Sequence, residues 1–279
     1  MKYKIIADSS CDLNKDYLKK TEIDFSVAPL TINVNGEDFV DDQNLDIRKM
    51  LDSVSAFKGK STSTCPSPTH FFDEMQGADK YFIITISSKL SGSFNSANVA
   101  KGMLANPDDA FVIDSKTTSG TMILIIDKLV ELINKGLSYE EICKEIHEYT
   151  NSRIELYFVL DRFDNLAKNG RVSPTQALIA SALSIKPICI ANDGEIKFAK
   201  KAIGIKWALK VLVREIGLRL KTMLPKHCII SHCFNAKIAE TLEKEMTEKY
   251  DFKSIRTISM RGLCSFYASE KGIIIGFEN

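Results

Sequence analysis

The stretch Tyr81–Ala97, YFIITISSKLSGSFNSA, decides the fold. Its first part, Tyr81–Ile86, is a β-branched and almost wholly apolar run, which is typical of a strand buried on both faces. A loop rich in serine and glycine follows, and a helical pattern starts at Phe94. In a βαβ unit, such a loop brings the unpaired N–H groups of the helix N-terminus to the carboxyl end of the sheet. The stretch therefore predicts a receptor for an anionic or carbonyl oxygen, unless the serines only cap the helix.

Two further predicted strands end in loops that are rich in serine and threonine. Lys2–Ile6 continues into ADSSC at 7–11, and Phe111–Ile113 continues into DSKTTSG at 114–120. Because the carboxyl ends of parallel strands meet at one edge of a sheet, we expect these hydroxyls to lie on one rim together with those of the central loop. Rim residues expected near a ligand are Ser9, Ser88 and Thr118.

Length, composition and charge exclude several classes of protein. The 279 residues suit two α/β domains or one large one, and 44% hydrophobic residues allow a sizeable core. A net charge of +1 argues against a nucleic-acid or anionic-membrane surface. Asp8 interrupts the N-terminal apolar run, so no signal peptide is predicted, and no apolar run approaches the ~20 residues of a membrane span. Seven cysteines without a CxxC pair indicate reduced thiols. We therefore expect a cytoplasmic protein without stable membrane insertion.

Alternating strands and helices fill the first half of the chain. This order predicts a Rossmann-like parallel sheet with helices on both faces, in a first domain of residues 1–155. Asn35-Gly36 predicts a hairpin between Thr31–Val34 and Glu37–Val40. Hairpins mixed with helices then predict an α+β layer domain of residues 156–279. The pattern predicts a polar loop at Lys60–Pro68 and helices that include Asn14–Lys20, Ile47–Ala56, Thr69–Met75, Met122–Asn134, Thr175–Leu183, Ile205–Thr222 and Ala236–Lys249.

Eight short motifs follow one another between Ile5 and Gly276. They are ADSSCDL, PLTI, TSTCPSP, ISSKLSGSFNSA, VIDSKTTSG, LAKNGRVSP, IKPI and DGEI. In this order they resemble the motifs of the DegV family of bacterial fatty-acid-binding proteins. The resemblance implies two α/β domains with one long-chain fatty acid in a tunnel between them, and its carboxylate held by hydroxyls of the first domain. It also implies a protein that is not an enzyme and has no cofactor, and that presents the bound acid to a separate fatty-acid kinase.

The resemblance also implies which residues bind the ligand. The family's TSQPS-type loop is matched by Ser63-Thr64-Cys65-Pro66-Ser67, so Ser63 holds the place of the carboxylate-binding threonine, or Thr62 does if the match shifts by one residue. The serine of the family's LSGT motif is matched by Ser91, with Ser93 two residues further on. The arginine of the family's GGR motif is matched by Arg171.

Two family positions are changed in this chain. The arginine that follows the DG hairpin falls on Ile203, and the histidine of the C-terminal HTGPG loop falls on Ala268, or on Ser269 with a shifted gap. The resemblance places both residues near the ligand head group or on the surface that faces the kinase. A hydrogen bond to a charged group contributes about 1.5–3 kcal/mol, whereas a buried CH₂ group contributes about 0.8 kcal/mol and a long chain has many. We therefore expect lipid binding to persist and kinase coupling to be the property at risk.

Other functions stay open at this point. A divergent family member would bind another apolar or neutral-headed ligand without kinase coupling. Asp8 and Asp114, each at a strand end, are an alternative Mg²⁺ pair for phosphoryl transfer, although a Gly-rich phosphate loop is missing. Ser91 is an alternative hydrolase nucleophile, although it lacks a GxSxG elbow. The His-Cys pairs at 227–228 and 232–233 fit no standard zinc spacing, so no metal site is predicted.

Overall fold

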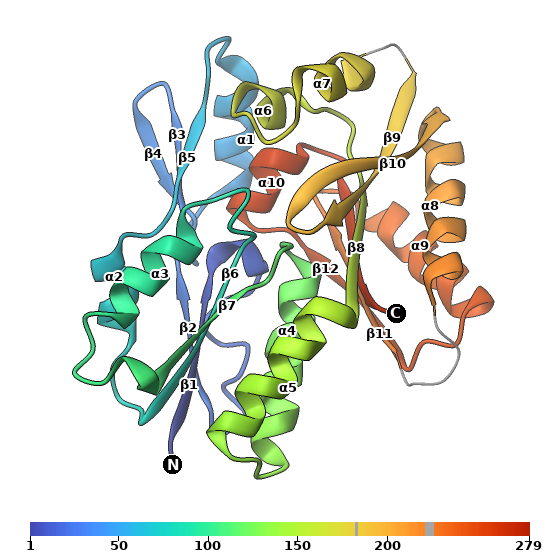
Figure 1. Cartoon of the computed structure of the whole chain (residues 1–279). Coiled ribbons are helices and arrows are strands. Elements are labelled where there is room, and N and C mark those ends of the chain that lie inside the picture. Colours follow the sequence, from blue (N-terminus) through green and yellow to red (C-terminus); the bar gives the residue numbers. More distant parts are fainter. Residues whose placement is uncertain (182–183, 221–225) are drawn as a thin grey trace.

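The computed structural model describes residues 1–181, 184–220 and 226–279, and its strands form three sheets (Figure 1). The first sheet is wholly parallel and has the strand order β2-β1-β6-β7. It is the parallel sheet that the alternation of strands and helices predicted. Its strands are β1 (Tyr3–Asp8), β2 (Asp24–Ala28), β6 (Lys80–Thr85) and β7 (Ala110–Asp114).

Helices cover both faces of this first sheet, as Figure 1 shows. Ile5 belongs to the apolar cluster on one face and Ile6 to the cluster on the other, because successive side chains of a strand point to opposite faces. The cluster around Ile6 packs against α2 and α3, and the cluster around Ile5 packs against α4 and α5. These helices are α2 (Pro68–Glu74), α3 (Ser93–Lys101), α4 (Gly120–Asn134) and α5 (Tyr139–Ser152), and two short 3₁₀ turns are η1 (Ser9–Cys11) and η2 (Pro107–Asp109).

The second sheet is mixed and has the order β10-β9-β8-β13-β11-β12, in which only β11 and β12 pair in parallel. Its strands are β8 (Ile154–Val159), β9 (Ile185–Asn192), β10 (Glu195–Ile203), β11 (His227–His232), β12 (Ser254–Ser259) and β13 (Ile273–Glu278). One face is covered by α8 (Ile205–Arg219) and α9 (Ala236–Lys249). The other face packs against shorter helices, which are α1 (Ile47–Ala56), α6 (Asp164–Lys168), α7 (Pro174–Ser181) and α10 (Gly262–Ala268).

A three-stranded antiparallel sheet, β4-β3-β5, joins the two halves of the chain. Its strands are β3 (Thr31–Val34), β4 (Glu37–Val40) and β5 (Thr62–Thr64). Ile32 and Phe39 belong to the same apolar cluster as Leu156 and Phe158 of β8. This part of the first half therefore packs with the second sheet. The division of the chain at residues 155 and 156 stays a prediction.

The helices and turns keep most of their predicted places. Asn35 and Gly36 both have positive φ, 52° and 85°, which is the backbone of the predicted type I′ turn between β3 and β4. Ser138 accepts a hydrogen bond from the backbone of Glu141, and its own N–H donates to the Glu141 side chain, so a capping box starts α5. No helix in the described part of the chain is long and apolar enough to cross a membrane.

Two local predictions are wrong, and one helix was missed. Asn14–Lys20 forms successive turns instead of a helix, because the Asn14 side chain accepts a hydrogen bond from the backbone N–H of Asp16 and competes with helical pairing. The loop predicted at Lys60–Pro68 contains β5, which pairs with β3. Helix α10 was not predicted. The predicted helices Thr175–Leu183 and Ile205–Thr222 run partly into residues 182–183 and 221–222, which lie outside the described residues.

Candidate functional site

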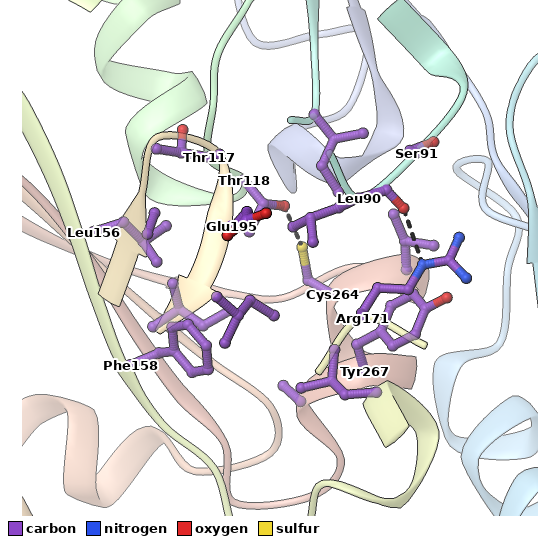
Figure 2. A pocket seen from close by; sticks show the side chains of 18 of the residues that line it. Leu90, Ser91, Thr117, Thr118, Leu156, Phe158, Arg171, Glu195, Cys264 and Tyr267 are labelled. Atoms are coloured by element: carbon purple, nitrogen blue, oxygen red, sulfur yellow. Dashed lines mark hydrogen bonds between the residues drawn. The ribbon is translucent and has the colours of Figure 1, made fainter. Parts of the chain in front are cut away.

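A largely apolar cavity, partly open to solvent, is lined by residues from both halves of the chain. Figure 2 shows Ser91, Arg171 and Tyr267 on one side of the cavity and Leu156 and Phe158 on the other. The apolar lining consists of Leu30, Ile86, Leu90, Leu156, Phe158, Leu160, Leu166, Ala191, Ile196, Leu263, Ala268 and Ile274.

Strand register builds the wall that the second sheet contributes. Leu156 and Phe158 lie two residues apart in β8 and therefore point to the same face. Phe158 is the direct cross-strand partner of Ile274 in β13, and Ala191 of β9 is that of Ile196 in β10. The wall is therefore one continuous face of four neighbouring strands. It offers hydrocarbon contacts to an apolar ligand.

Ser91 enters the cavity from the loop between β6 and α3. Its Oγ accepts a hydrogen bond from the backbone N–H of Ser93, at 3.3 Å, and lies 3.2 Å from the Ser93 Oγ. Gly92 allows this loop to lie close to Cys65, since a Cβ at residue 92 would be 3.2 Å from the Cys65 Sγ. Ser91 lines the cavity, whereas Ser93 is fully buried behind it and is not part of the lining.

Ser63 lies in the middle of β5, opposite Ile32 of β3. It lines the cavity, and its Oγ is 2.8 Å from the hydroxyl of Tyr267 in α10. Thr62 precedes it in the same strand and is not part of the lining, because neighbouring strand residues point to opposite faces. Of the two residues that the TSQPS-type loop left open, Ser63 is the one that reaches the cavity.

Arg171 follows α6 and connects the two halves of the molecule at the edge of the cavity. Its Nε donates to the backbone oxygen of Leu90 at 2.9 Å, and its Nη1 donates to the backbone oxygen of Asn169 at 2.6 Å. Within the described ranges, Nη2 makes no hydrogen bond. Because Leu90 precedes Ser91, the guanidinium is fixed beside the serine loop and keeps a donor group for an anion.

The other rim residues have separate roles. Thr118 lines the cavity and donates its hydroxyl hydrogen to the backbone oxygen of Ser10, at 3.2 Å. Ser88 is exposed and its hydroxyl donates to Asp114. Ser9 is fully buried and accepts a hydrogen bond from the Leu30 backbone. The structure therefore brings together Ser63, Ser91, Thr118 and Arg171, and keeps Thr62, Ser93, Ser88 and Ser9 out of the cavity lining.

Asp8 and Asp114 do not form an open pair for a metal ion. Asp8 is 0% exposed and accepts hydrogen bonds from the backbone of Ile86, at 2.9 Å, and from the backbone and side chain of Ser10. Burial raises its pKa to about 6, against these hydrogen bonds and one from Ser93. Asp114 accepts from the backbone N–H groups of Ser88 and Lys116, at 3.1 and 2.9 Å. Both carboxylates therefore fix loops, and the described residues give the Mg²⁺ alternative no support.

The two altered family positions lie in different environments. Ile203 is 76% exposed at the end of β10 and does not line the cavity. It is eight residues beyond the lining residue Glu195, which is roughly 26 Å along a strand at about 3.3 Å per residue. The placement of this position near the ligand head group stays a prediction, and its exposure suits the other expectation, a surface that faces the kinase. Ala268 is buried and lines the cavity.

Tyr267 was missed by sequence reasoning. It belongs to α10, whose N-terminal N–H groups at Gly262 and Leu263 donate to the buried carboxylate of Asp41, both at 2.8 Å. These partners are more than 200 residues apart, so no local pattern marks the start of this helix. A sequence signal for Tyr267 was its position immediately before Ala268, the first residue of the segment matched to the HTGPG loop.

A parallel sheet with helices on both faces, a separate mixed sheet and a largely apolar cavity lined from both halves place the chain in a class of two-domain α/β proteins. A family model described as "Uncharacterised protein, DegV family" matches residues 2–278 of this chain. The chain belongs to the DegV family, and the prediction made from the eight motifs is confirmed.

Curated relatives and solved structures support this membership over the whole length. A DegV domain-containing protein of Streptococcus pyogenes serotype M3 is 38% identical, with 100% of both chains covered. The Streptococcus pneumoniae fatty acid kinase B3 protein, solved loaded with linoleic acid, has a TM-score of 0.93 and 35% identity, covering 100% of this chain and 99% of that one. A DegV family protein from Eubacterium eligens, loaded with heptadecanoic acid, has a TM-score of 0.90 and 31% identity, covering 99% of each chain.

Proposed function

We propose that this protein binds one long-chain fatty acid in the cavity, with the carboxylate at Ser63 and Ser91 and the acyl chain against the wall of the second sheet. The observation that carries the proposal is a largely apolar cavity in which Ser91, Arg171 and Tyr267 lie on the side opposite Leu156 and Phe158. An amphipathic ligand with a small polar head and a long apolar tail matches this arrangement. The linoleic and heptadecanoic acids bound by two relatives support the choice of ligand class.

The acyl chain of such a ligand contributes more to the free energy of binding than its carboxylate does. Each buried CH₂ group contributes about 0.8 kcal/mol, which sums to roughly 10 kcal/mol before losses for a long chain. Each hydrogen bond to the carboxylate contributes about 1.5–3 kcal/mol. The hydroxyls at Ser63 and Ser91 therefore fix the orientation and select an acid, while the wall supplies most of the affinity.

We propose binding without catalysis. A serine nucleophile needs a general base within hydrogen-bond reach, and the hydrogen-bond partners of the Ser91 Oγ are the backbone and hydroxyl of Ser93. None of the four histidines of the chain lines the cavity. These two observations support a carrier over a hydrolase.

Presentation of the carboxylate to a separate fatty-acid kinase is the finer part of the proposal. It is supported by the name of the Streptococcus pneumoniae relative, a fatty acid kinase B3 protein. Ile203 is strongly exposed where the family resemblance places an arginine, so the contact surface for such a kinase differs from that of the relatives. A family member that carries an acid without this coupling is the alternative that this one residue favours.

Native mass spectrometry of protein purified without detergent tests the binding proposal. We expect one fatty acid per chain, identified after extraction into organic solvent. Ser91→Ala is expected to reduce the occupancy, whereas Ser88→Ala, at a serine of the same loop outside the cavity lining, should leave it unchanged. A chain that is empty as purified and takes up no added fatty acid would contradict the proposal.

A further inference from the structure

The hydroxyl side of the cavity contains a phenol that the family motifs do not assign. The Tyr267 hydroxyl lies 2.8 Å from the Ser63 Oγ, and both residues line the cavity. Figure 2 draws Tyr267 beside Arg171, on the same side as Ser91. Ser63, Ser91, Arg171 and Tyr267 come from four separate parts of the chain and all line the cavity.

Helix α10 holds Tyr267 in a fixed place. Its first N–H groups donate to the fully buried carboxylate of Asp41, and the N–H of Arg261 donates to buried Asp12 at 2.7 Å. At the other end of the helix, the Asn165 side chain donates to the Phe266 backbone oxygen at 2.7 Å. The phenol ring also packs edge-on against Phe266, with 4.7 Å between ring centroids. The helix is therefore anchored at both ends, which restrains the phenol without a ligand.

Two paired hydroxyls leave one hydrogen available. Each hydroxyl has one hydrogen and accepts through its lone pairs, so in the Ser63–Tyr267 pair one group donates to its partner and the other hydrogen is free. A carboxylate accepts only, and its two oxygens have room for several donors. A ligand head group placed beside this pair would therefore receive the free hydrogen and the one from Ser91.

We propose that Tyr267 is a head-group residue, and that its phenol acts with Ser63 as a donor pair to the carboxylate of the bound acid. This assignment rests on the proposed fatty-acid function. It gives the chain a polar donor one residue before Ala268, the position matched to the family histidine. The donor is neutral, so the site recognises the carboxylate through hydroxyls and Arg171 without an imidazole.

The test compares an acid with its alcohol. Tyr267→Phe keeps the ring and removes only the hydroxyl, and the dissociation constants for dodecanoic acid and 1-dodecanol are measured by calorimetry on delipidated protein. Loss of a hydrogen bond to a charged group corresponds to about 10-fold to 100-fold weaker binding of the acid. Binding of the alcohol should change less than about threefold. The matched control is Tyr81→Phe, whose hydroxyl donates to the Ala78 backbone away from the cavity.

A double variant separates a donor pair from two independent donors. Ser63→Ala with Tyr267→Phe should weaken acid binding by more than the two single changes added together, because each single variant keeps one hydroxyl hydrogen that the carboxylate can accept and the double variant keeps none. Equal acid affinity of Tyr267→Phe and wild type would overturn the role of Tyr267 and leave the proposed function standing. If the losses of binding free energy in the two single variants add up to the loss in the double variant, Ser63 and Tyr267 do not act as a pair. A wild-type chain that binds neither ligand would overturn the proposed function and, with it, this assignment.

Discussion

Gly276 of β13 lies directly against the backbone of Thr121 in the first turn of α4. A Cβ built on Gly276 would be 2.5 Å from the Thr121 backbone nitrogen and 2.8 Å from the carbonyl carbon of Gly120. Since α4 packs on the first sheet through its apolar face and β13 is a central strand of the second, this contact sets the spacing of the two halves. The cavity lies in the same region of the fold, because Ile274 of β13 and Thr118, just before α4, line it.

Gly276→Ala should destabilise the chain. The added methyl group meets backbone atoms, which cannot rotate away, and overpacking of this kind typically costs about 1–3 kcal/mol or more. Urea denaturation measures the change in the free energy of unfolding. Gly102→Ala is the control, because a Cβ there would lie no closer than 3.3 Å to its neighbours and φ is −66°. Equal stability of the two variants would contradict the close approach.

Asp12 should make the stability depend on pH. Burial raises its pKa from 3.8 to about 7, opposed by hydrogen bonds from Ser119 and the Arg261 backbone. Between pH 3.8 and about pH 7, Asp12 is protonated in the folded chain and ionised in the unfolded chain. The contribution of Asp12 to the free energy of unfolding therefore falls as the pH rises. In this range the free energy of unfolding falls by about 1.4 kcal/mol per pH unit. Above pH 7 the contribution of Asp12 no longer changes with pH.

The test is Asp12→Asn, which keeps one acceptor oxygen and does not titrate. From pH 5 to pH 7.5 we expect wild type to lose about 2 kcal/mol more stability than the variant. Buried Asp8 and Asp41 also have raised pKa values and contribute a slope of the same sign in both proteins. Parallel stability curves of wild type and variant over this range would exclude Asp12 as the source.

The tip of the β9–β10 hairpin is held to the first half of the chain by Ser87. Its hydroxyl donates to the backbone oxygen of Gly194 at 2.7 Å, in a buried place. Ser87→Ala leaves that oxygen unpaired, which costs about 1–3 kcal/mol. Because Gly194 and Glu195 line the cavity, we expect faster release of a bound fatty acid, measured by transfer to an acceptor protein.

The control for this hairpin is an ion pair at the same tip. Lys116 and Asp193 are 2.8 Å apart, and their side chains are 40% and 77% exposed. Exposed pairs contribute about 0–1 kcal/mol, so Lys116→Ala should change the release rate little. A larger effect for Lys116→Ala than for Ser87→Ala would show that charge, and not the buried hydrogen bond, holds the tip.

The sequence allowed us to predict those elements whose structure is determined by residues close together in the chain. The strand and loop at Tyr81–Ala97 and the hairpin at Asn35-Gly36 each depend on neighbours within a few residues. Ser63 and Ser91, which line the cavity, were named as ligand residues because they lie in motifs that resemble those of the family. The pairing of β5 with β3, and the start of α10 on Asp41, depend on residues far apart in the chain.

The same division bears on two serines that were expected near the ligand. Ser9 was placed on the rim because it follows a strand end, and Ser93 was placed at the carboxylate because it follows the serine of the LSGT motif, yet both are fully buried. Their hydroxyls serve the buried carboxylates of Asp41 and Asp8, with which they form hydrogen bonds. A serine at a strand end therefore has two competing uses, and only the packing of the surrounding loops decides between them.

Ala191 offers a way to shorten the cavity. It lines the hydrocarbon wall on β9, beside Ile196. A larger side chain there should displace part of the acyl chain, at about 0.8 kcal/mol for each CH₂ group that no longer fits. In a graded series, Ala191→Val and Ala191→Phe should shift the extracted fatty acids towards progressively shorter chains. An unchanged chain-length profile in both variants would place the acyl chain elsewhere.

Tyr267→His should add a pH-dependent donor to the hydroxyl side of the cavity. An imidazole becomes a cation below about pH 6.5, whereas a phenol donates as a neutral group. Dodecanoic acid is ionised at both pH 5.5 and pH 8, so the variant should bind it several-fold more tightly at the lower pH. Asp8 also titrates in this range and adds the same change to both proteins, so the quantity to measure is the difference between variant and wild type. Calorimetric titration with 1-dodecanol, which has no charge, should show no such difference. If the acid and the alcohol respond alike, residue 267 does not contact the head group.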